Sequence, residues 1–391
     1  MDEESVLKMN RFNIRASDDR RAAKKRMIDQ RIQSEKIVKL TDEVLRQALA
    51  QRVSDIHLEP MGVQTYRIRF RIDGALFLYT VLSSEDYMSM ISRIKILAQL
   101  DISDKRSVQD GAFVFHDIPM RVSVLPTVHG EHLVIRILDS RYYIRDLSRL
   151  GLLPEQIEKL DRMTARREGL ILISGPTGSG KTTTLFSIAN RLNREALHVV
   201  SLEEPAEILI PGVTQVSLSG VRDFSFEKGV RAVLRQDPDI IILGEIRDAP
   251  SARAAIRAAA TGHLCFATIH ARSAWGCRER LLDFGVPDYM AQDQLIGLVA
   301  QRLVPRICPA CGKVVDMSEA QRQKLNLSKK GKLRDGAGCP ACRQTGRAGR
   351  IGLFEVVDPE RDASTPRPFR ASAVAHLKKG KVAYADAEPY L

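Results

Sequence analysis

Aromatic residues and long hydrophobic runs are scarce in this sequence. Aromatics make up 5% of the 391 residues, with a single tryptophan, so the aromatic platforms on which single-stranded nucleic acids stack are not expected. Apolar runs such as LILI at residues 170–173 fall far short of the ~18 residues that a transmembrane helix needs. The opening residues, MDEESVLKMN, contain no signal-peptide core. These absences together predict a cytoplasmic chain.

Acidic residues are in the minority, and cysteines are few. The 48 Asp and Glu residues are outnumbered by 60 Lys and Arg residues, which gives a formal charge of +12. This excess favours an acidic partner, such as nucleic acid, anionic lipid or an acidic protein, without choosing among them. Four of the six cysteines form two CxxC pairs. In a reducing compartment such pairs indicate bound metal or free thiols rather than disulfides.

Hydrophobic residues, at 44% of the chain, are numerous enough for two or three domain cores. Residues 36–139 mix helical periodicity with strand alternation, as in QTYRIRFRI, which predicts an α+β domain. From Leu170 onward, apolar strands alternate with helical stretches, which predicts an α/β fold with a parallel sheet. Six segments are expected: a charged extension (1–35), the α+β domain (36–139), a linker (140–169), the α/β domain (170–304), a cysteine-rich module (305–351) and a C-terminal tail (352–391).

The segment LILISGPTGSGKTTTLFSIANRL has the order strand, glycine loop, helix. Within it, GPTGSGKT at residues 175–182 matches a phosphate-binding loop at every specified position. Glycines let backbone N–H groups face the phosphates, and the helix N-terminus adds partial positive charge. Lys181 is expected to reach the β- and γ-phosphates, and the Thr182 hydroxyl to bind Mg²⁺. The alternative is a chance glycine turn, against which the flanking strand and helix argue. The expected nucleotide-binding residues are Gly175, Pro176, Thr177, Gly178, Ser179, Gly180, Lys181, Thr182 and Thr183.

The stretch DPDIIILGEIRD, residues 237–248, places polar residues directly after four aliphatic ones. Such a run predicts a buried parallel strand, and open α/β sheets bind ligands at the carboxyl ends of their strands. Gly244 stands where nucleotide-binding proteins usually carry a magnesium-holding aspartate, and Glu245 follows it. Glu245 is therefore the candidate to orient or deprotonate the attacking water. The alternative is a polar turn in which Glu245 pairs with Arg247.

Polar residues also end two other predicted strands. HVVSLEEPAE, residues 198–207, contains Glu203 and Glu204 at the end of its strand. Beside a phosphate loop these acids are candidate ligands of magnesium or water, and otherwise they belong to a solvated loop. LCFATIH ends in His270, for which spacing alone leaves structural and catalytic roles equally open.

These segments together resemble the secretion ATPase superfamily of type II secretion and type IV pilus systems, the GspE/PilB group. GPTGSGKT resembles the Walker A loop of that family, SLEEPAE its Asp box, LRQDPDIIILGEIRD its atypical Walker B segment and TGHLCFATIHA its His box. SDIHLEP and RFRIDG resemble its PAS-like N-terminal domain. The resemblance covers residues 36–357 and implies a RecA-like nucleotide domain preceded by a PAS-like domain, with ATP and Mg²⁺ bound.

The resemblance also implies roles for single residues. Glu245 is the catalytic glutamate, His270 lies near the γ-phosphate, and Glu204 and Glu207 belong to the nucleotide site, although the family more often has aspartate at position 204. Family members are hexameric rings in which arginines of the N-terminal domain approach nucleotide at domain or subunit contacts. Arg69 in RIRFRIDG is the best match for such a catalytic arginine, followed by Arg71, Arg121 and Arg136. The alternative is a strand-surface arginine paired with an acid, and this alternative is stronger for Arg121 and Arg136.

The motif CPAC occurs at residues 308–311 and again at 339–342. Each pair places two thiolates on a tight turn, and two such turns complete a tetrahedral zinc site. Disulfide and redox uses are the alternatives. In the resembling family, assembly-type members carry such a module, whereas retraction-type members typically lack it. The expected metal ligands are Cys308, Cys311, Cys339 and Cys342, and the packing residues are Cys265 and Cys277.

The leading functional hypothesis is a cytoplasmic hexameric ATPase, peripheral at the inner face of the cytoplasmic membrane. It is expected to use ATP, Mg²⁺ and Zn²⁺ and to power assembly of a type IV pilus or type II pseudopilus through an inner-membrane platform protein. Nucleic acid is not the expected partner. The alternatives are a nucleic-acid motor or DNA-binding ATPase, which the basic charge suggests, and a retraction or conjugative pilus ATPase. Only about 35 residues precede the PAS-like segment, so an extra N-terminal docking domain is expected to be missing.

Overall fold

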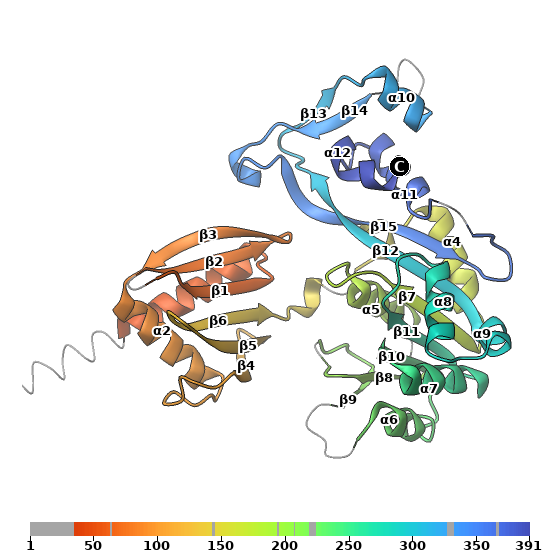
Figure 1. The fold of residues 1–391 in the computed structure, drawn as a ribbon, viewed down its shortest axis with the longest axis horizontal. Helices are drawn as coiled ribbons and strands as arrows, with labels where there is room; N and C mark the ends of the chain where they lie inside the picture. The colour runs from red at the N-terminus through yellow and green to blue at the C-terminus, as the bar shows by residue number, and fades with distance from the viewer. Residues whose placement is uncertain are drawn as a thin grey trace, which may run out of the picture. The chain divides into compact units, whose positions relative to one another are not determined.

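The structure is a computed structural model in which the chain divides into two compact units (Figure 1). The boundary in the sequence lies between Leu138 and Asp139. The structure describes residues 35–391 except 63–64, 143–144, 194, 207, 219–223, 327–331 and 365–366. Apart from Glu35, the predicted N-terminal extension lies outside these residues. Each unit has its own hydrophobic core.

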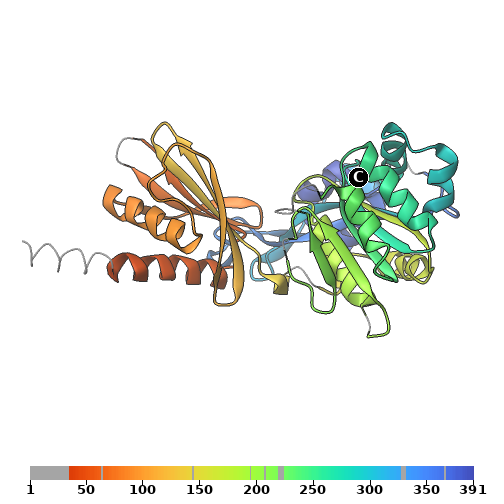
Figure 2. The same cartoon turned by 90° about the horizontal axis from the view of Figure 1, so that it is seen from below.

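Unit 1 is an antiparallel sheet with helices on one face (Figure 2). Residues 35–50 form one helix, and α2 (Ser84–Leu97) forms another. The strand order is β3-β2-β1-β6-β5-β4. The strands are β1 (Asp55–Pro60), β2 (Tyr66–Ile72), β3 (Ala75–Leu82), β4 (Gln109–Phe115), β5 (Ile118–Thr127) and β6 (Gly130–Ile137).

Apolar and basic residues alternate along β2, so one face of this sheet is apolar and the other is charged. Ile68 and Phe70 are buried under the helices, while Arg67, Arg69 and Arg71 occupy the opposite face, because successive strand residues point to opposite sides. The alternation in QTYRIRFRI therefore predicts this strand correctly. The face away from the helices, called the outer face below, is rich in charge. The likeness of this unit to a PAS domain stays a prediction.

Unit 2 is built on a seven-stranded sheet of order β15-β12-β7-β11-β10-β8-β9. All neighbours pair in parallel except β12 and β15, so the predicted α/β fold with a parallel sheet is confirmed. The strands are β7 (Gly169–Ser174), β8 (Val199–Glu203), β9 (Thr214–Ser217), β10 (Ile240–Ile246), β11 (Leu264–Ile269), β12 (Leu295–Ile307) and β15 (Arg347–Val357).

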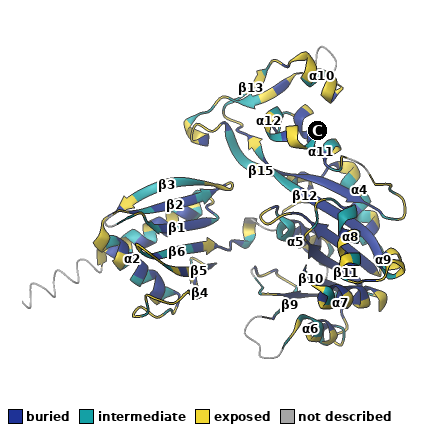
Figure 3. Ribbon diagram, viewed as in Figure 1, coloured by how far each residue is buried: buried dark blue, intermediate teal, exposed yellow. Residues whose placement is uncertain are grey.

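Helices cover both faces of this sheet, and its central strands are buried (Figure 3). Leu170 and Leu172 of β7 pack in one core, and Ile171 and Ile173 pack in the other. A strand buried on both faces needs a continuous aliphatic run, which explains the sequence LILI. One face is covered by α4 (Pro154–Thr164) and α5 (Lys181–Leu192); the other by α6 (Phe226–Val233), α7 (Ala249–Ala260), α8 (Trp275–Asp283) and α9 (Asp288–Gln294).

The range 140–169, expected as a linker, contains α3 (Leu147–Leu150) and α4. Leu147, Leu160 and Met163 from these helices are buried in the α5-side core, so most of this range is integral to unit 2. The division of the chain into six segments stays a prediction.

Beyond the sheet, β12 and β15 run on as a ribbon to the cysteine-rich module (Figure 1). The module contains β13 (Gly312–Val315), α10 (Glu319–Leu325) and β14 (Leu333–Gly336). The C-terminal tail forms α11 (Arg370–Lys378) and α12 (Tyr384–Ala387), which contact β14. Leu377 and Leu391 are buried, so the tail is part of the core of unit 2. Among the described residues, no helix combines the length and the apolarity needed to cross a bilayer.

Replacing Phe266 should destabilise unit 2. The side chain lies in β11 and is fully buried, so Phe266→Ala should lower the free energy of unfolding by about 3–5 kcal/mol through lost burial and a residual cavity. The chain has a single tryptophan, Trp275, in α8, so its fluorescence in a denaturant titration reports unit 2. Leu209→Ala, at a side chain that is 72% exposed, is the control and should change stability by less than about 0.5 kcal/mol. Equal midpoints for the two variants would contradict the buried position of Phe266.

Candidate functional site

The phosphate-binding loop joins β7 to α5. Gly178 and Gly180 have φ angles of 75° and 88°, in the left-handed region that favours glycine. Gly175, with a φ angle of 153°, also has a close approach: a Cβ there would lie 2.4 Å from Ser179 Oγ and 2.6 Å from the Gln301 carbonyl oxygen. Backbone conformation therefore favours glycine at all three positions, and close packing excludes a side chain at Gly175 as well.

Lys181 begins α5 and directs its ammonium group back over the loop. Its Nζ donates hydrogen bonds to the carbonyl oxygens of Gly175, at 2.9 Å, and Pro176, at 3.4 Å. Burial lowers the pKa of Lys181, while the negative charge of Glu245 acts in the opposite direction. The first backbone N–H groups of α5 lack intrahelical partners, so the helix end and the lysine both favour an anion here.

The remaining loop residues differ in exposure. Ser179 is buried, whereas the tip of the loop is exposed and the first helical turn is half-buried. The exposed residues are Pro176, Thr177 and Gly178, and the half-buried ones are Gly180, Lys181, Thr182 and Thr183.

A β-bulge at Gly244 decides which way Glu245 points. The parallel register between β10 and β11 shifts between Leu243 and Glu245. As a result, Leu243 and Ile246 lie in the same core, on the α7 side, although they are three positions apart. Glu245 is thus turned to the other side, which α5 covers. A Cβ at Gly244 would lie 3.2 Å from the Leu202 carbonyl oxygen of β8, so a side chain there would press on that strand.

The carboxylate of Glu245 has two basic partners. Its Oε1 lies 2.7 Å from His270 Nε2, and its Oε2 accepts a hydrogen bond from Arg247 Nε at 2.7 Å. Arg247 also lies 3.6 Å from the carboxylate of Glu204. The alternative pairing of Glu245 with Arg247 is therefore present, but so is the contact with His270. Three predicted residues from three different strand ends are brought into one polar network.

The two adjacent acids at the end of β8 have different environments. Glu203 is buried, and its Oε1 accepts hydrogen bonds from Ser201 at 2.7 Å and Gln215 at 2.9 Å. This pattern is that of a residue that fixes the chain after β8. Glu204 is exposed and joins the polar network through Arg247. Glu207, the other acid expected at the nucleotide site, lies outside the described residues.

Sequence reasoning missed a polar pair within β12. Gln301 is buried, and its Nε2 donates a hydrogen bond to the Ser179 carbonyl oxygen of the phosphate loop at 2.6 Å. The next residue, Arg302, donates to the Arg272 carbonyl oxygen at 2.7 Å, and its positive charge also lowers the pKa of Lys181. The available signal was the pair QR inside the otherwise apolar segment LIGLVAQRLV. β12 therefore helps to position the loop.

Arg69 belongs to unit 1, whereas the loop and Glu245 belong to unit 2. On β2, its guanidinium forms an ion pair with Glu59, whose Oε2 it contacts at 2.6 Å, and Arg67 contacts the same oxygen at 2.7 Å. These contacts hold the pKa of Glu59 at about 2, against the opposing effect of burial. Arg136 is likewise paired, with Asp55 at 2.9 Å. The strand-surface pairing left open by the sequence is thus present.

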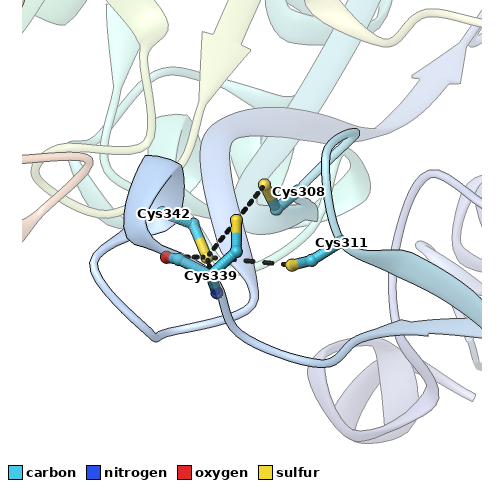
Figure 4. A group of neighbouring side chains, drawn as sticks. All are labelled: Cys308, Cys311, Cys339 and Cys342. Atoms are coloured by element: carbon cyan, nitrogen blue, oxygen red, sulfur yellow. Dashed lines mark hydrogen bonds between the residues drawn. The ribbon is translucent and has the colours of Figure 1, made fainter.

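The four paired cysteines converge at the base of the module (Figure 4). The Sγ atoms of Cys308 and Cys339 lie 3.9 Å apart, those of Cys311 and Cys342 lie 3.8 Å apart, and those of Cys339 and Cys342 lie 3.7 Å apart. Backbone N–H groups of Cys339 and Gly346 each donate to the Cys342 sulfur at 3.2 Å. All six cysteines are free thiols. The other two, Cys265 and Cys277, are buried in the core, as expected.

The polar network and loop described above belong to a chain with clear relatives. The model of the family described as type II/IV secretion system protein matches residues 30–380. The chain is 39% identical over 330 residues to type II secretion system protein HxcR of Pseudomonas aeruginosa, covering 83% of this chain and 67% of that one. It is 40% identical over 330 residues to the type IV pilus assembly ATPase TfpB of Acinetobacter baylyi, covering 82% of this chain and 56% of the relative.

A solved structure supports the fold. The pilus retraction motor PilT, crystallised with bound ADP, superposes with a TM-score of 0.61 at 24% identity, covering 90% of this chain and 96% of PilT. At that identity the likeness concerns the fold alone. Since the family model matches most of the chain, the sequence resemblance is confirmed. The chain belongs to the type II/IV secretion system protein family, the family of secretion and pilus ATPases.

Proposed function

We propose that this chain hydrolyses ATP to power assembly of a type IV pilus or a type II secretion pseudopilus. The observation that carries the proposal is the convergence of three chemically different groups at one edge of the sheet. Lys181 follows β7, His270 follows β11, and Glu245 lies at the end of β10, and these three strands are adjacent. Glu245 contacts His270 directly and influences the pKa of Lys181. A phosphate cradle, a carboxylate and a histidine therefore face one site.

Each group has a role in the proposed reaction. The loop N–H groups and Lys181 bind the phosphates, and the Thr182 hydroxyl and Glu204 would help to hold Mg²⁺. The bound ion supplies neutralisation of the phosphate charge. Glu245 orients the attacking water and accepts its proton, for which it must exchange its contacts with Arg247 and His270 for water. His270, half-exposed beside it, would contact the γ-phosphate.

The first prediction separates binding from chemistry. Lys181→Ala should abolish nucleotide binding, because it removes the cation of the loop. Glu245→Gln should still bind ATP but lose turnover by about 10²–10⁴, the range for a missing general base. Nucleotide fluorescence titration and phosphate release measure the two properties. Glu227→Gln on α6, an exposed acid paired with Arg231, is the control and should do neither. A normal hydrolysis rate for Glu245→Gln would exclude Glu245 as the catalytic carboxylate.

We further propose that the four cysteines bind zinc. Tetrahedral ligands about 2.3 Å from zinc lie about 3.8 Å apart, and the three Sγ separations of 3.7, 3.8 and 3.9 Å agree with this spacing. The N–H···S hydrogen bonds to Cys342 favour the thiolate form that metal binding needs. The ligands would be Cys308, Cys311, Cys339 and Cys342, and the ion would fix the base of the module.

Removing this zinc should loosen the module and leave the nucleotide fold intact. Cys308→Ser and Cys339→Ser should each lower bound zinc by one ion per chain and expose residues 305–351 to protease, because a structural zinc is worth roughly 10–16 kcal/mol to its own module. Elemental analysis and limited proteolysis measure the two effects. Cys277→Ala, which alters a buried thiol outside the cluster, should retain the ion. Reduced wild-type protein without zinc would contradict the proposal.

The proposed setting is a homohexameric ring bound peripherally at the inner face of the cytoplasmic membrane, where it drives an inner-membrane platform protein. Family membership supports this setting, and so does the formal charge of +12, which favours an acidic surface. The cysteine module favours assembly over retraction, by the family pattern stated above. ATPase stimulation by single-stranded DNA, without stimulation by a platform protein's cytoplasmic domain, would favour a nucleic-acid motor instead.

Within such a ring, Arg69 is proposed to act on nucleotide held by a neighbouring subunit. Arg69→Ala should lower turnover, with 10³–10⁵ as the upper guide from other nucleotide hydrolases. Mixing Arg69→Ala chains with Glu245→Gln chains should restore activity, because some sites then combine an intact Glu245 with an intact neighbouring arginine. Arg67→Ala removes another guanidinium bonded to Glu59 and is the matched control. Equal activities for the two arginine variants, without rescue on mixing, would leave Arg69 as a structural residue.

A further inference from the structure

Two histidines and a glutamate share the outer face of the unit 1 sheet. β1 and β6 pair antiparallel, with His57 opposite Val134 and Leu58 opposite Leu133. Leu58 and Leu133 are fully buried on the helix side. Their neighbours His57, Glu59 and His132 must therefore point to the outer face, because strand residues alternate. Sequence analysis did not connect these residues, which lie 75 positions apart at their extremes.

The two imidazoles face each other closely, yet each has an unsatisfied nitrogen. Their ring centroids lie 5.9 Å apart, with an angle of 25° between the planes. The Nε2 atom of His57 and the Nε2 atom of His132 are both inaccessible to solvent and have no hydrogen-bond partner among the described residues. An unpaired buried nitrogen is costly, so both imidazoles have a nitrogen that could bind a ligand.

Glu59 completes a set of three donors. One ligand atom from each of His57, Glu59 and His132 can be chosen such that all three lie within 4.8 Å of one another. Ligands at zinc–nitrogen and zinc–oxygen distances of about 2.0–2.1 Å are separated by about 3.3 Å in a tetrahedron, so modest side-chain rotations close the set. The carboxylate is bonded to Arg67 and Arg69, but two oxygens offer about four lone-pair sites, which leaves capacity for a cation.

We propose that His57, His132 and Glu59 form a second metal site, which binds a divalent transition cation of the Zn²⁺ class through two imidazole nitrogens and one carboxylate oxygen. Imidazole ligands suit zinc, copper and nickel and disfavour Mg²⁺ and Ca²⁺, which prefer oxygen alone. Three protein ligands leave at least one coordination position for water. The site lies wholly within unit 1, and its test below measures metal binding rather than ATP hydrolysis.

The charges around the site limit its affinity. Asp55 and Glu59 favour a cation, whereas Arg67, Arg69 and Arg71 on the adjacent strand oppose it. The tetracysteine site offers four sulfur ligands, which suit zinc better than two imidazoles and one carboxylate that is shared with arginines. Zinc should consequently fill the cysteines first and the histidine site second.

The test is a zinc titration of the full chain. Protein first loaded with one equivalent of Zn²⁺, and cleared of excess, is titrated with further Zn²⁺ in a calorimeter. The wild-type chain should bind one additional equivalent. His57→Gln and His132→Gln should each weaken this second event at least about tenfold, because each removes one of three ligands. Both variants should retain the first zinc and the melting temperature of the wild-type protein without added metal.

A matched control and a second readout make the test decisive. His129→Gln changes an exposed histidine at the turn before β6 and should bind the second zinc normally. Co²⁺ in place of the second zinc should give weak visible bands without the strong thiolate charge-transfer absorption of a cysteine site. Absence of the second event in the wild-type chain would overturn the proposal. Equal binding by wild type and His132→Gln would also overturn it, since the metal would then lie elsewhere.

Discussion

Parallel pairing of β7, β11 and β10 is the constraint on which the nucleotide site depends. Parallel neighbours end at the same edge of a sheet, so whatever follows each strand is gathered at one place. Segments almost 90 residues apart in the chain, carrying Lys181 and His270, meet for this reason alone. The aliphatic runs that bury these strands on both faces thus position polar residues that take no part in the burial.

A departure from regular strand geometry, the β-bulge in β10, sets the direction of Glu245 at that edge. A regular β10 would direct Glu245 into the α7-side core, where an ionised carboxylate without a partner is strongly unfavourable. The bulge at Gly244 moves Ile246 into that core and turns Glu245 to the α5 side. A side chain at Gly244 would crowd β8, because its Cβ would lie 3.2 Å from the Leu202 carbonyl oxygen. Packing against β8 therefore favours a small residue at position 244.

Much of the site could be predicted because its signals are local in sequence. Short motifs of a dozen residues or fewer indicate the kind of site in each case: the loop 175–182, the aliphatic run before Glu245, and the two CPAC motifs. The parts that were missed depend on long-range contacts. Gln301 reaches the loop from 122 residues away, and its role follows only from the adjacency of β12 and β7. Glu203 and Glu204 are identical residues side by side, and only tertiary structure distinguishes the buried one from the exposed one. The sequence likewise gave no sign that His57 faces His132.

The course of β12 connects two sites that sequence treats as separate. Gln301 holds the phosphate loop, and seven residues further along the same strand region stands Cys308. An extended strand rises about 3.3 Å per residue, so the two points are joined by about 23 Å of backbone, most of which pairs antiparallel with β15. The cysteine cluster and the phosphate loop are thus both attached to β12. A rigid connection between them would depend on the pairing of β12 with β15, whose register shifts between Pro305 and Ile307, just before Cys308.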